Sequence, residues 1–157
     1  MILRGVPVAV LCLFAAGMSG AQEASPACAA IPGSTESCVR VLACIGTAGL
    51  WFDAQAIGWD TGTVHGSTSD GSPCTGTWNA DGPLGMGVAA LRCDSGLTAD
   101  VFYYNQDNAT GTVIGAGQDN RGRGISVWTG TNVLEFLTPD GHLAARLPCG
   151  GGEIPIS

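Results

Sequence analysis

Lysine is absent from this chain, and charge of either sign is scarce. Only 12% of the 157 residues are charged, with 13 acidic residues against six arginines, and only 6% are aromatic. Nucleic-acid binding requires clustered cations that neutralise phosphates, and anionic membrane surfaces attract proteins through the same kind of cluster. The composition therefore predicts no nucleic-acid partner and no attachment to anionic lipid.

Long apolar runs are also missing, apart from one at the N-terminus. Arg4 precedes an apolar segment at 6–18, and the small residues Ser19, Gly20 and Ala21 follow it. This order is typical of a signal peptide. The apolar segment is shorter than a membrane-spanning helix, which needs about 20 residues. We predict a signal peptide at 1–21, a periplasmic or secreted product, and no membrane span after cleavage. A transmembrane helix or a lipoprotein is the alternative.

Catalytic and metal-binding motifs are likewise missing. The chain has no Gly-x-Ser-x-Gly elbow, no Cys-x-x-Cys pair, and only two histidines, His65 and His142. Hydrolases of the α/β class need the first motif, and zinc sites need closely spaced cysteine or histidine ligands. We therefore predict no catalytic residue, no metal ligand and no cofactor. Calcium near Asp107-Asn108 or Asp119-Asn120 is the alternative, although no EF-hand spacing is present.

Cysteine, in contrast, is plentiful. Removal of the signal peptide takes away Cys12 and leaves Cys28, Cys38, Cys44, Cys74, Cys93 and Cys149. An even number in an exported chain predicts a disulfide framework. Cys74 and Cys93 flank a predicted hairpin and should pair. Cys38 and Cys44 should not, because six strand residues span about 20 Å while bonded Cα atoms lie within about 7 Å. Two solutions remain, 28–38 with 44–149 or 28–44 with 38–149.

A repeat with an offset of 49 residues organises the mature chain, which carries five arginines against 13 acids and a net charge of −8. Segments 61–64 and 110–113 both read Thr-Gly-Thr-Val. The other matched pairs are Val39 and Val88, Leu42 and Leu91, Cys44 and Cys93, Gly66 and Gly115, Asp70 and Asp119, and, with one inserted residue, Trp78 and Trp128. We predict a duplication with repeats at 39–86 and 88–138. Chance similarity in a chain rich in glycine and threonine is the alternative.

Short apolar runs separated by turn residues predict strands throughout the mature chain. The expected strands are 39–45, 50–57, 61–66, 74–78, 87–93, 97–104, 110–114, 124–129, 132–137 and 142–147. Turn signals recur at intervals typical of antiparallel β-proteins, and helices are an alternative only at 36–44 and 133–137. The predicted fold is all-β, an antiparallel meander that closes into a small disulfide-stapled barrel or sandwich. It forms one domain at 38–148, between an N-terminal segment at 22–37 and a tail at 149–157.

Two resemblances accompany this pattern. Thr75-Gly76-Thr77-Trp78, followed by Gly82, Gly85-Met86-Gly87 and Asp94-Ser95-Gly96, resembles a loose MORN-type hairpin repeat, although the gaps differ and Cys74 replaces an aromatic residue. That resemblance implies antiparallel hairpins and nothing about catalysis. Segments 38–46 and 128–134 resemble uncharacterised exported bacterial proteins, a group that supports export only.

The candidate binding residues are aromatic. Trp51, Trp59, Tyr103 and Tyr104 are expected to form an exposed platform for an unknown protein or glycan. Trp78 and Trp128 occupy matched repeat positions and are expected in the core. His65 aligns with Ile114 and is expected to be packed or partly buried, whereas His142 is expected in solvent.

The pattern favours an exported, monomeric, non-enzymatic binding or structural module. One alternative is a small hydrolase that uses the turn carboxylates of Asp53, Asp60, Asp100 and Asp107. The other is an inhibitor of a secreted enzyme.

Overall fold

The structure is a computed structural model that describes residues 28–107, 110–130 and 146–155. The predicted signal peptide, the predicted strand at 132–137, most of the one at 142–147 and His142 lie outside the described residues. Within the described part of the chain, no helix is long and apolar enough to cross a membrane.

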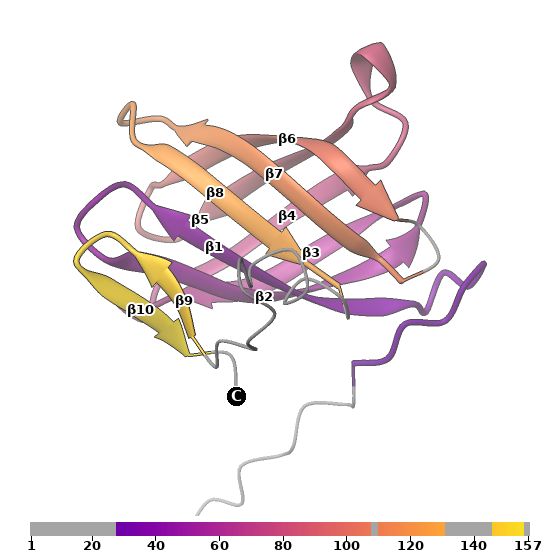
Figure 1. The fold of residues 1–157 in the computed structure, drawn as a ribbon, viewed down its shortest axis with the longest axis horizontal. Coiled ribbons are helices and arrows are strands. Elements are labelled where there is room, and N and C mark those ends of the chain that lie inside the picture. The colour runs from indigo at the N-terminus through magenta and orange to yellow at the C-terminus, as the bar shows by residue number, and fades with distance from the viewer. Residues whose placement is uncertain (1–27, 108–109, 131–145, 156–157) are drawn as a thin grey trace, which may run out of the picture.

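Eight antiparallel strands close into a barrel, as Figure 1 shows. The strands are β1 (Cys38–Ile45), β2 (Leu50–Trp59), β3 (Thr61–Thr68), β4 (Pro73–Asn79), β5 (Gly87–Cys93), β6 (Thr98–Asp107), β7 (Thr112–Asp119) and β8 (Gly124–Thr129). Each strand pairs with the next, and β8 pairs back onto β1 from Val41 opposite Thr129 to Ile45 opposite Ile125. The predicted all-β meander is therefore confirmed, and of the two predicted closures it takes the barrel. Residues 38–45 form a strand, so the helical alternative at 36–44 is wrong.

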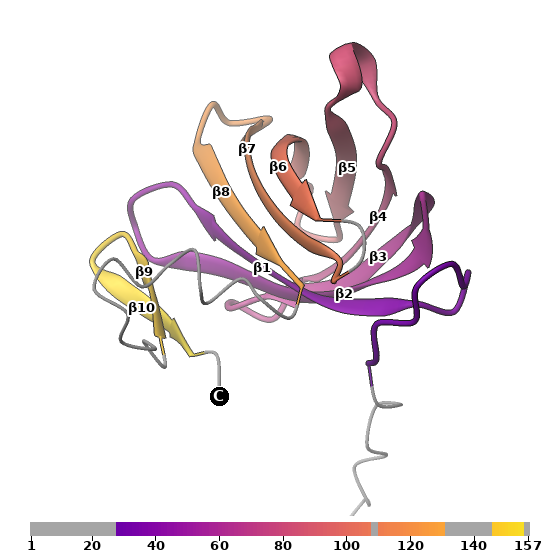
Figure 2. The same cartoon turned by 45° about the vertical axis from the view of Figure 1, so that its right-hand side comes forward.

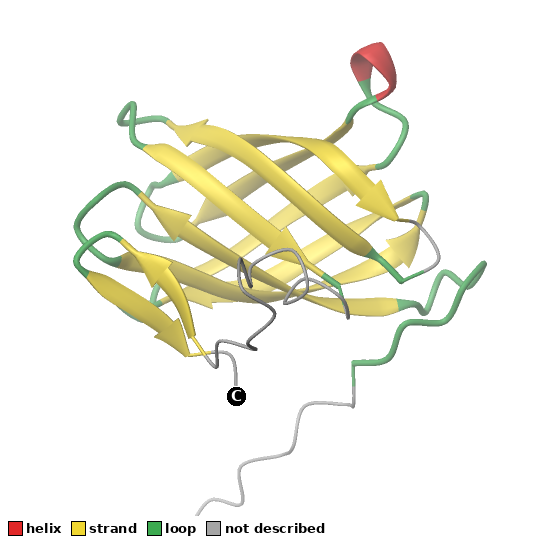
Figure 3. Ribbon diagram, in the orientation of Figure 1, coloured by secondary structure: helices red, strands yellow, loops and turns green. Residues whose placement is uncertain are grey.

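Alternate residues of each strand point into the barrel, and most of these inward residues are apolar. Phe52, Ala54 and Ala56 of β2 are buried, while Asp53 and Gln55 between them are not. Strand and turn structure account for nearly all of the described chain, and one 3-10 turn at Pro83–Gly85 lies in the loop between β4 and β5 (Figure 3). The inner core mixes alanines such as Ala54 and Ala99 with larger residues such as Phe52 and Ile125.

His65 is exposed, which corrects the prediction that it is packed. On β3, Val64 takes the buried inward position, and His65 therefore points outward between Gln55 and Thr75 of the neighbouring strands. Its repeat counterpart Ile114 is half-buried for a separate reason, because it packs against a second apolar cluster on the outer surface. The two aligned residues therefore differ in burial, because the outer cluster covers Ile114 and not His65.

A two-stranded hairpin forms that outer cover. Strand β9 (Arg146–Cys149) pairs with β10 (Gly152–Pro155), and the hairpin lies against the outside of the barrel beside β1 (Figure 2). The C-terminal tail was predicted to start at residue 149, and the hairpin spans that boundary, which lies within β9. The outer cluster combines hairpin and barrel residues: Leu42, Cys44, Trp51, Ile114, Trp128, Leu147, Cys149 and Ile154. Trp128 is thus buried as expected, but outside the barrel.

Three disulfides join Cys28 to Cys38, Cys44 to Cys149, and Cys74 to Cys93. The last links directly opposed residues of β4 and β5, as predicted. The first two settle the open choice between the two predicted connectivities. Cys44 and Cys149 are both buried in the outer cluster, so their bond ties the hairpin to the barrel. Intrachain disulfides of this number are typical of oxidising compartments outside the cytoplasm.

Candidate functional site

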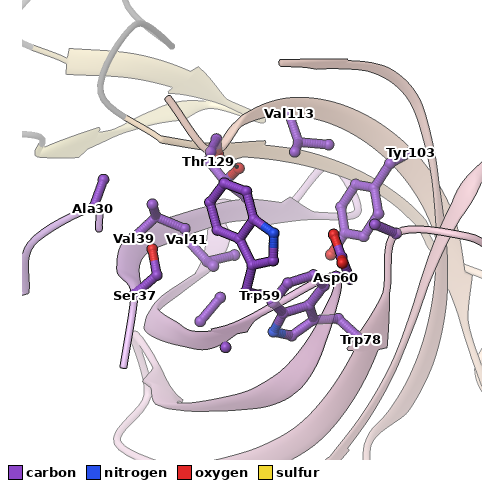
Figure 4. A pocket seen from close by; sticks show the side chains of 14 residues that line it. Ala30, Ser37, Val39, Val41, Trp59, Asp60, Trp78, Tyr103, Val113 and Thr129 are labelled. Atoms are coloured by element: carbon purple, nitrogen blue, oxygen red, sulfur yellow. Dashed lines mark hydrogen bonds between the residues drawn. The ribbon is translucent and has the colours of Figure 1, made fainter. Parts of the chain in front are cut away.

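A cavity of about 80 Å³ opens at one end of the barrel. Its walls come from the beginnings of β1 and β7, the ends of β2, β4 and β8, and the β2–β3 turn, which meet there because the strands are antiparallel. The lining residues, drawn in Figure 4, are Ala30, Ser37, Val39, Val41, Ala56, Gly58, Trp59, Asp60, Trp78, Ala80, Tyr103, Gly111, Val113 and Thr129. The space exceeds the roughly 10–15 Å³ that one water molecule needs.

Three aromatic rings dominate the cavity walls. Trp59 stands at the mouth, Trp78 lies below it, and Tyr103 faces both from β6 (Figure 4). Trp78 fits against β3 because residue 62 is glycine, where a Cβ would lie 2.6 Å from the indole Nε1. That Nε1 is buried and has no hydrogen-bond partner. The Trp78 side chain therefore contributes a ring face to the cavity rather than a hydrogen bond to the fold.

Asp60 is the charged group of the lining. It connects β2 to β3 with a left-handed backbone at φ 59°, a region that aspartate tolerates better than most residues. Its carbonyl oxygen accepts a hydrogen bond from the Ala80 N–H at 2.7 Å, which fixes the turn against the end of β4. Among the described residues, its carboxylate has no hydrogen-bond or ion-pair partner. Figure 4 shows that carboxylate between the rings of Trp59 and Tyr103.

The remaining polar groups of the lining are neutral. Burial raises the pKa of Tyr103 to about 12, so its hydroxyl stays protonated at physiological pH. The Ser37 hydroxyl accepts a hydrogen bond from the Ile31 N–H at 3.0 Å, and the Thr129 hydroxyl donates to the Gly111 carbonyl at 2.7 Å. Each of these two hydroxyls therefore already has one partner in the fold, and a ligand would meet mainly rings, aliphatic groups and one carboxylate.

A second, smaller cavity of about 40 Å³ lies deeper in the barrel. Its lining is apolar, with Ala43, Ala89, Ala99 and Val127 among its members. Val41 and Tyr103 line both cavities, so these side chains stand between the mouth and the interior.

The four predicted binding residues occupy three different places. Trp59 and Tyr103 line the mouth cavity together. Trp51 packs against the outer cluster under the hairpin, and Tyr104 is 64% exposed on the outer surface of β6. The platform expected from all four therefore reduces, geometrically, to the pair Trp59 and Tyr103.

The sequence pattern did not indicate Trp78 as a binding residue, and it indicated Asp60 only as a candidate catalytic carboxylate. Trp78 was expected in the core, and it does pack against the barrel core with one face. Asp60 could have been recognised from its position directly after Trp59, because this places a carboxylate next to an aromatic side chain at the end of a strand.

The other turn and strand carboxylates mostly have partners. Arg40 donates two hydrogen bonds to Asp53, at 3.0 and 2.7 Å, on the outer face of β1 and β2. Asp107 accepts a hydrogen bond from the Thr110 hydroxyl at 2.8 Å. Asp119, named above for the alternative of a calcium site, accepts a hydrogen bond from the Arg123 guanidinium. No group of three or more histidine, cysteine or acidic residues within the described ranges is placed to hold a metal ion.

No family model, no curated protein and no solved structure matches this chain. The function must therefore be argued from the geometry of the cavity and its residues.

Proposed function

We propose that this protein is an exported binding module whose ligand occupies the mouth of the barrel. The observation that supports this most directly is the cavity of about 80 Å³ walled by Trp59, Trp78 and Tyr103. Small-molecule sites are concave and mainly apolar, with few polar groups that fix the ligand's orientation. The three disulfides support an oxidising compartment, and with the predicted signal peptide they favour a periplasmic or secreted location.

The lining favours a ligand with an apolar body over an extended glycan. A sugar presents hydroxyl groups on every side, and burying them without hydrogen bonds is costly. The Ser37 and Thr129 hydroxyls each already have one partner within the protein, and the lining offers few other polar groups to meet the sugar hydroxyls. A compact molecule with an apolar body fits these walls better.

Binding at this site is testable with a small neutral probe, 3,3-dimethyl-1-butanol. We expect the indole N–H resonance of Trp59 to shift on titration while that of Trp51 stays, since Trp51 lies on the outer face of the same strand. A molecule of this size should bind with a Kd of about 1 mM. Uniform small shifts of all four tryptophan resonances would contradict the proposal.

A cavity-filling variant provides the matched test. Ala56 is buried and faces the cavity, so Ala56→Leu should abolish the Trp59 shift, and Val113→Phe should act in the same way if the first variant folds poorly. Trp51→Phe is the control and should leave binding unchanged. Unaltered binding in a folded cavity-filling variant would refute the site.

One observation favours a second candidate, the inhibitor of a secreted enzyme. The β4–β5 loop projects from the barrel in Figure 1, and Leu84 at its tip is 94% exposed with a left-handed φ of 61°. Strained, exposed apolar residues on projecting loops occur at sites of interaction. If the protein inhibits a secreted hydrolase through this loop, Leu84→Glu should abolish the inhibition and Ala56→Leu should not.

A further inference from the structure

We propose that the ligand of the mouth cavity is a small organic cation, an alkylammonium group held by Asp60 and the rings of Trp59, Trp78 and Tyr103. This inference rests on the proposed function and specifies its ligand. It does so by combining three observations on the same cavity: a carboxylate without a partner, a set of aromatic faces around it, and apolar walls of limited volume.

The carboxylate of Asp60 gives the site its charge. Asp60 is the acidic residue of the lining, and the Tyr103 hydroxyl stays protonated at neutral pH because burial raises its pKa to about 12. Arg40 and Arg123 form ion pairs with Asp53 and Asp119, and none of the described arginines pairs with Asp60. Asp60 therefore remains available to a cation from outside.

The aromatic rings favour one class of cation. The negative face of an aromatic ring attracts a cation, most strongly for tryptophan, and groups of such rings recognise alkylated ammonium ions. Here Trp59 and Tyr103 flank the Asp60 carboxylate, and Trp78 lies beneath it (Figure 4). A strongly hydrated ion such as sodium gains little from these faces, whereas an alkylammonium ion contacts them without losing a tight hydration shell.

The dimensions and charge of the protein favour the same class. A cavity of about 80 Å³ accommodates a compact ammonium group but not a long chain unless the inner cavity also opens. Anions are disfavoured because the chain has a formal net charge of −7 and places a carboxylate at the entrance. Val39, Val41 and Val113 provide aliphatic contacts for the alkyl body of the ligand.

The test compares choline chloride with 3,3-dimethyl-1-butanol, its neutral isostere, by titration followed through the Trp59 indole resonance. We expect the wild-type protein to bind choline about tenfold more tightly than the alcohol, since cation–π attraction and the carboxylate act only on the charged ligand. This preference should shrink in high salt, because the Asp60 side chain is exposed and its charge is screened.

Asp60→Asn removes the charge and keeps a residue that tolerates the left-handed turn. It should reduce the preference for choline over the alcohol, measured as the ratio of the two Kd values, to about twofold or less. Asp94→Asn, in the β5–β6 turn at the opposite end of the barrel, is the control and should keep the full preference.

The outcomes separate the two proposals. If the alcohol binds at Trp59 as tightly as choline, the cation inference fails and the binding function stands. If Asp60→Asn keeps the wild-type preference, the assignment to Asp60 is wrong. If neither compound shifts the Trp59 resonance, both this inference and the proposed function fail.

Discussion

Gly62 illustrates how one residue both allows β3 to approach β2 and shapes the barrel mouth. A Cβ at this position would overlap the Ile57 carbonyl oxygen and lie 2.6 Å from the Trp78 Nε1. Gly62→Ala should therefore displace Trp78 and lower the free energy of unfolding by about 1–3 kcal/mol, the usual cost of overpacking. Urea denaturation measures the loss, and the intrinsic fluorescence should report the movement of the indole.

Gly124→Ala is the matched control in the same barrel. A Cβ at residue 124 meets nothing within 4 Å, and its φ is not left-handed. The substitution should leave stability unchanged or raise it by about 0.4–1 kcal/mol, since alanine restricts the unfolded chain. Equal losses at both positions would show that the close approach of Ile57 and Trp78 is not the reason for glycine at 62.

Tyr103 gives the protein a sensitivity to high pH. Burial raises the pKa of Tyr103 to about 12, whereas a tyrosine in the unfolded chain titrates near 10. Between these values the unfolded chain releases the phenolic proton and the native state retains it, so stability is complete below pH 10 and declines above it. The total loss by pH 12 is about 2–3 kcal/mol.

Tyr103→Phe should remove most of this alkaline loss. Urea midpoints at pH 8, 10 and 11.5 for both proteins provide the measurement. The wild-type midpoint should fall more steeply across the upper interval, and a variant with the same decline would show that other groups cause it.

At the scale of elements, the β9–β10 hairpin depends on one covalent bond. The Cys44–Cys149 disulfide joins residues 105 positions apart, whereas Cys74–Cys93 joins positions 19 apart. By chain entropy the longer loop contributes about 4–5 kcal/mol and the shorter one about 3 kcal/mol. Removal of Cys44–Cys149 by double alanine substitution should therefore cost more stability and release the hairpin.

Release of the hairpin has a distinct signature. Leu42, Trp128 and Ile114 would lose their cover, so the Cys44→Ala/Cys149→Ala protein should bind a hydrophobic dye while its β-sheet circular dichroism persists. Cys74→Ala/Cys93→Ala is the comparison, since that bond connects paired strands and covers no outer surface. Strong dye binding by the second variant and not the first would contradict this role for the hairpin.

The sequence predicted the strands well because the signals are local. Apolar runs and turn residues lie within a few positions of each other, and the observed β1 to β8 each overlap a predicted strand. Closure was less predictable, since it depends on β1 pairing with β8 across most of the domain. The choice between the two disulfide solutions for Cys28, Cys38, Cys44 and Cys149 also depended on that placement.

The site was predictable only in part, because strand parity decides which side chains meet. Trp78 and Trp128 align in sequence, yet Trp78 lines the mouth and Trp128 lies under the hairpin. Asp70 and Asp119 also align in sequence, but they do not occupy the same position in their turns. The Thr68 N–H donates to the Ser72 carbonyl just as the Asp119 N–H donates to the Arg123 carbonyl, so Thr68 is the structural equivalent of Asp119. The duplication therefore stays a prediction, and pairing by sequence offset does not give equivalent surroundings.

At the scale of the whole molecule, low pH should lower the free energy of unfolding. The chain has 13 acidic residues against six arginines and two histidines, so protonation of the carboxylates changes its net charge from negative to positive. Asp119 is the carboxylate whose protonation affects the fold most directly. Its side chain is fully buried and accepts hydrogen bonds from the N–H groups of Arg121 and Arg123 and from the Arg123 guanidinium at 2.7 Å.

Burial alone would raise the pKa of Asp119, but the hydrogen bonds and charge of Arg123, with the Arg121 N–H, outweigh it and lower the pKa below its usual range. The stabilisation is therefore complete above the unfolded value of about 3.9 and is lost as the pH falls through the lower native value. Asp119→Asn should lower the free energy of unfolding by about 2 kcal/mol at pH 7 and by clearly less at pH 2. Urea unfolding at both pH values, with Asp94→Asn as the exposed control, measures this difference. A loss that is equal at both pH values would mean that the side chain's packing, and not its charge, stabilises the β7–β8 turn.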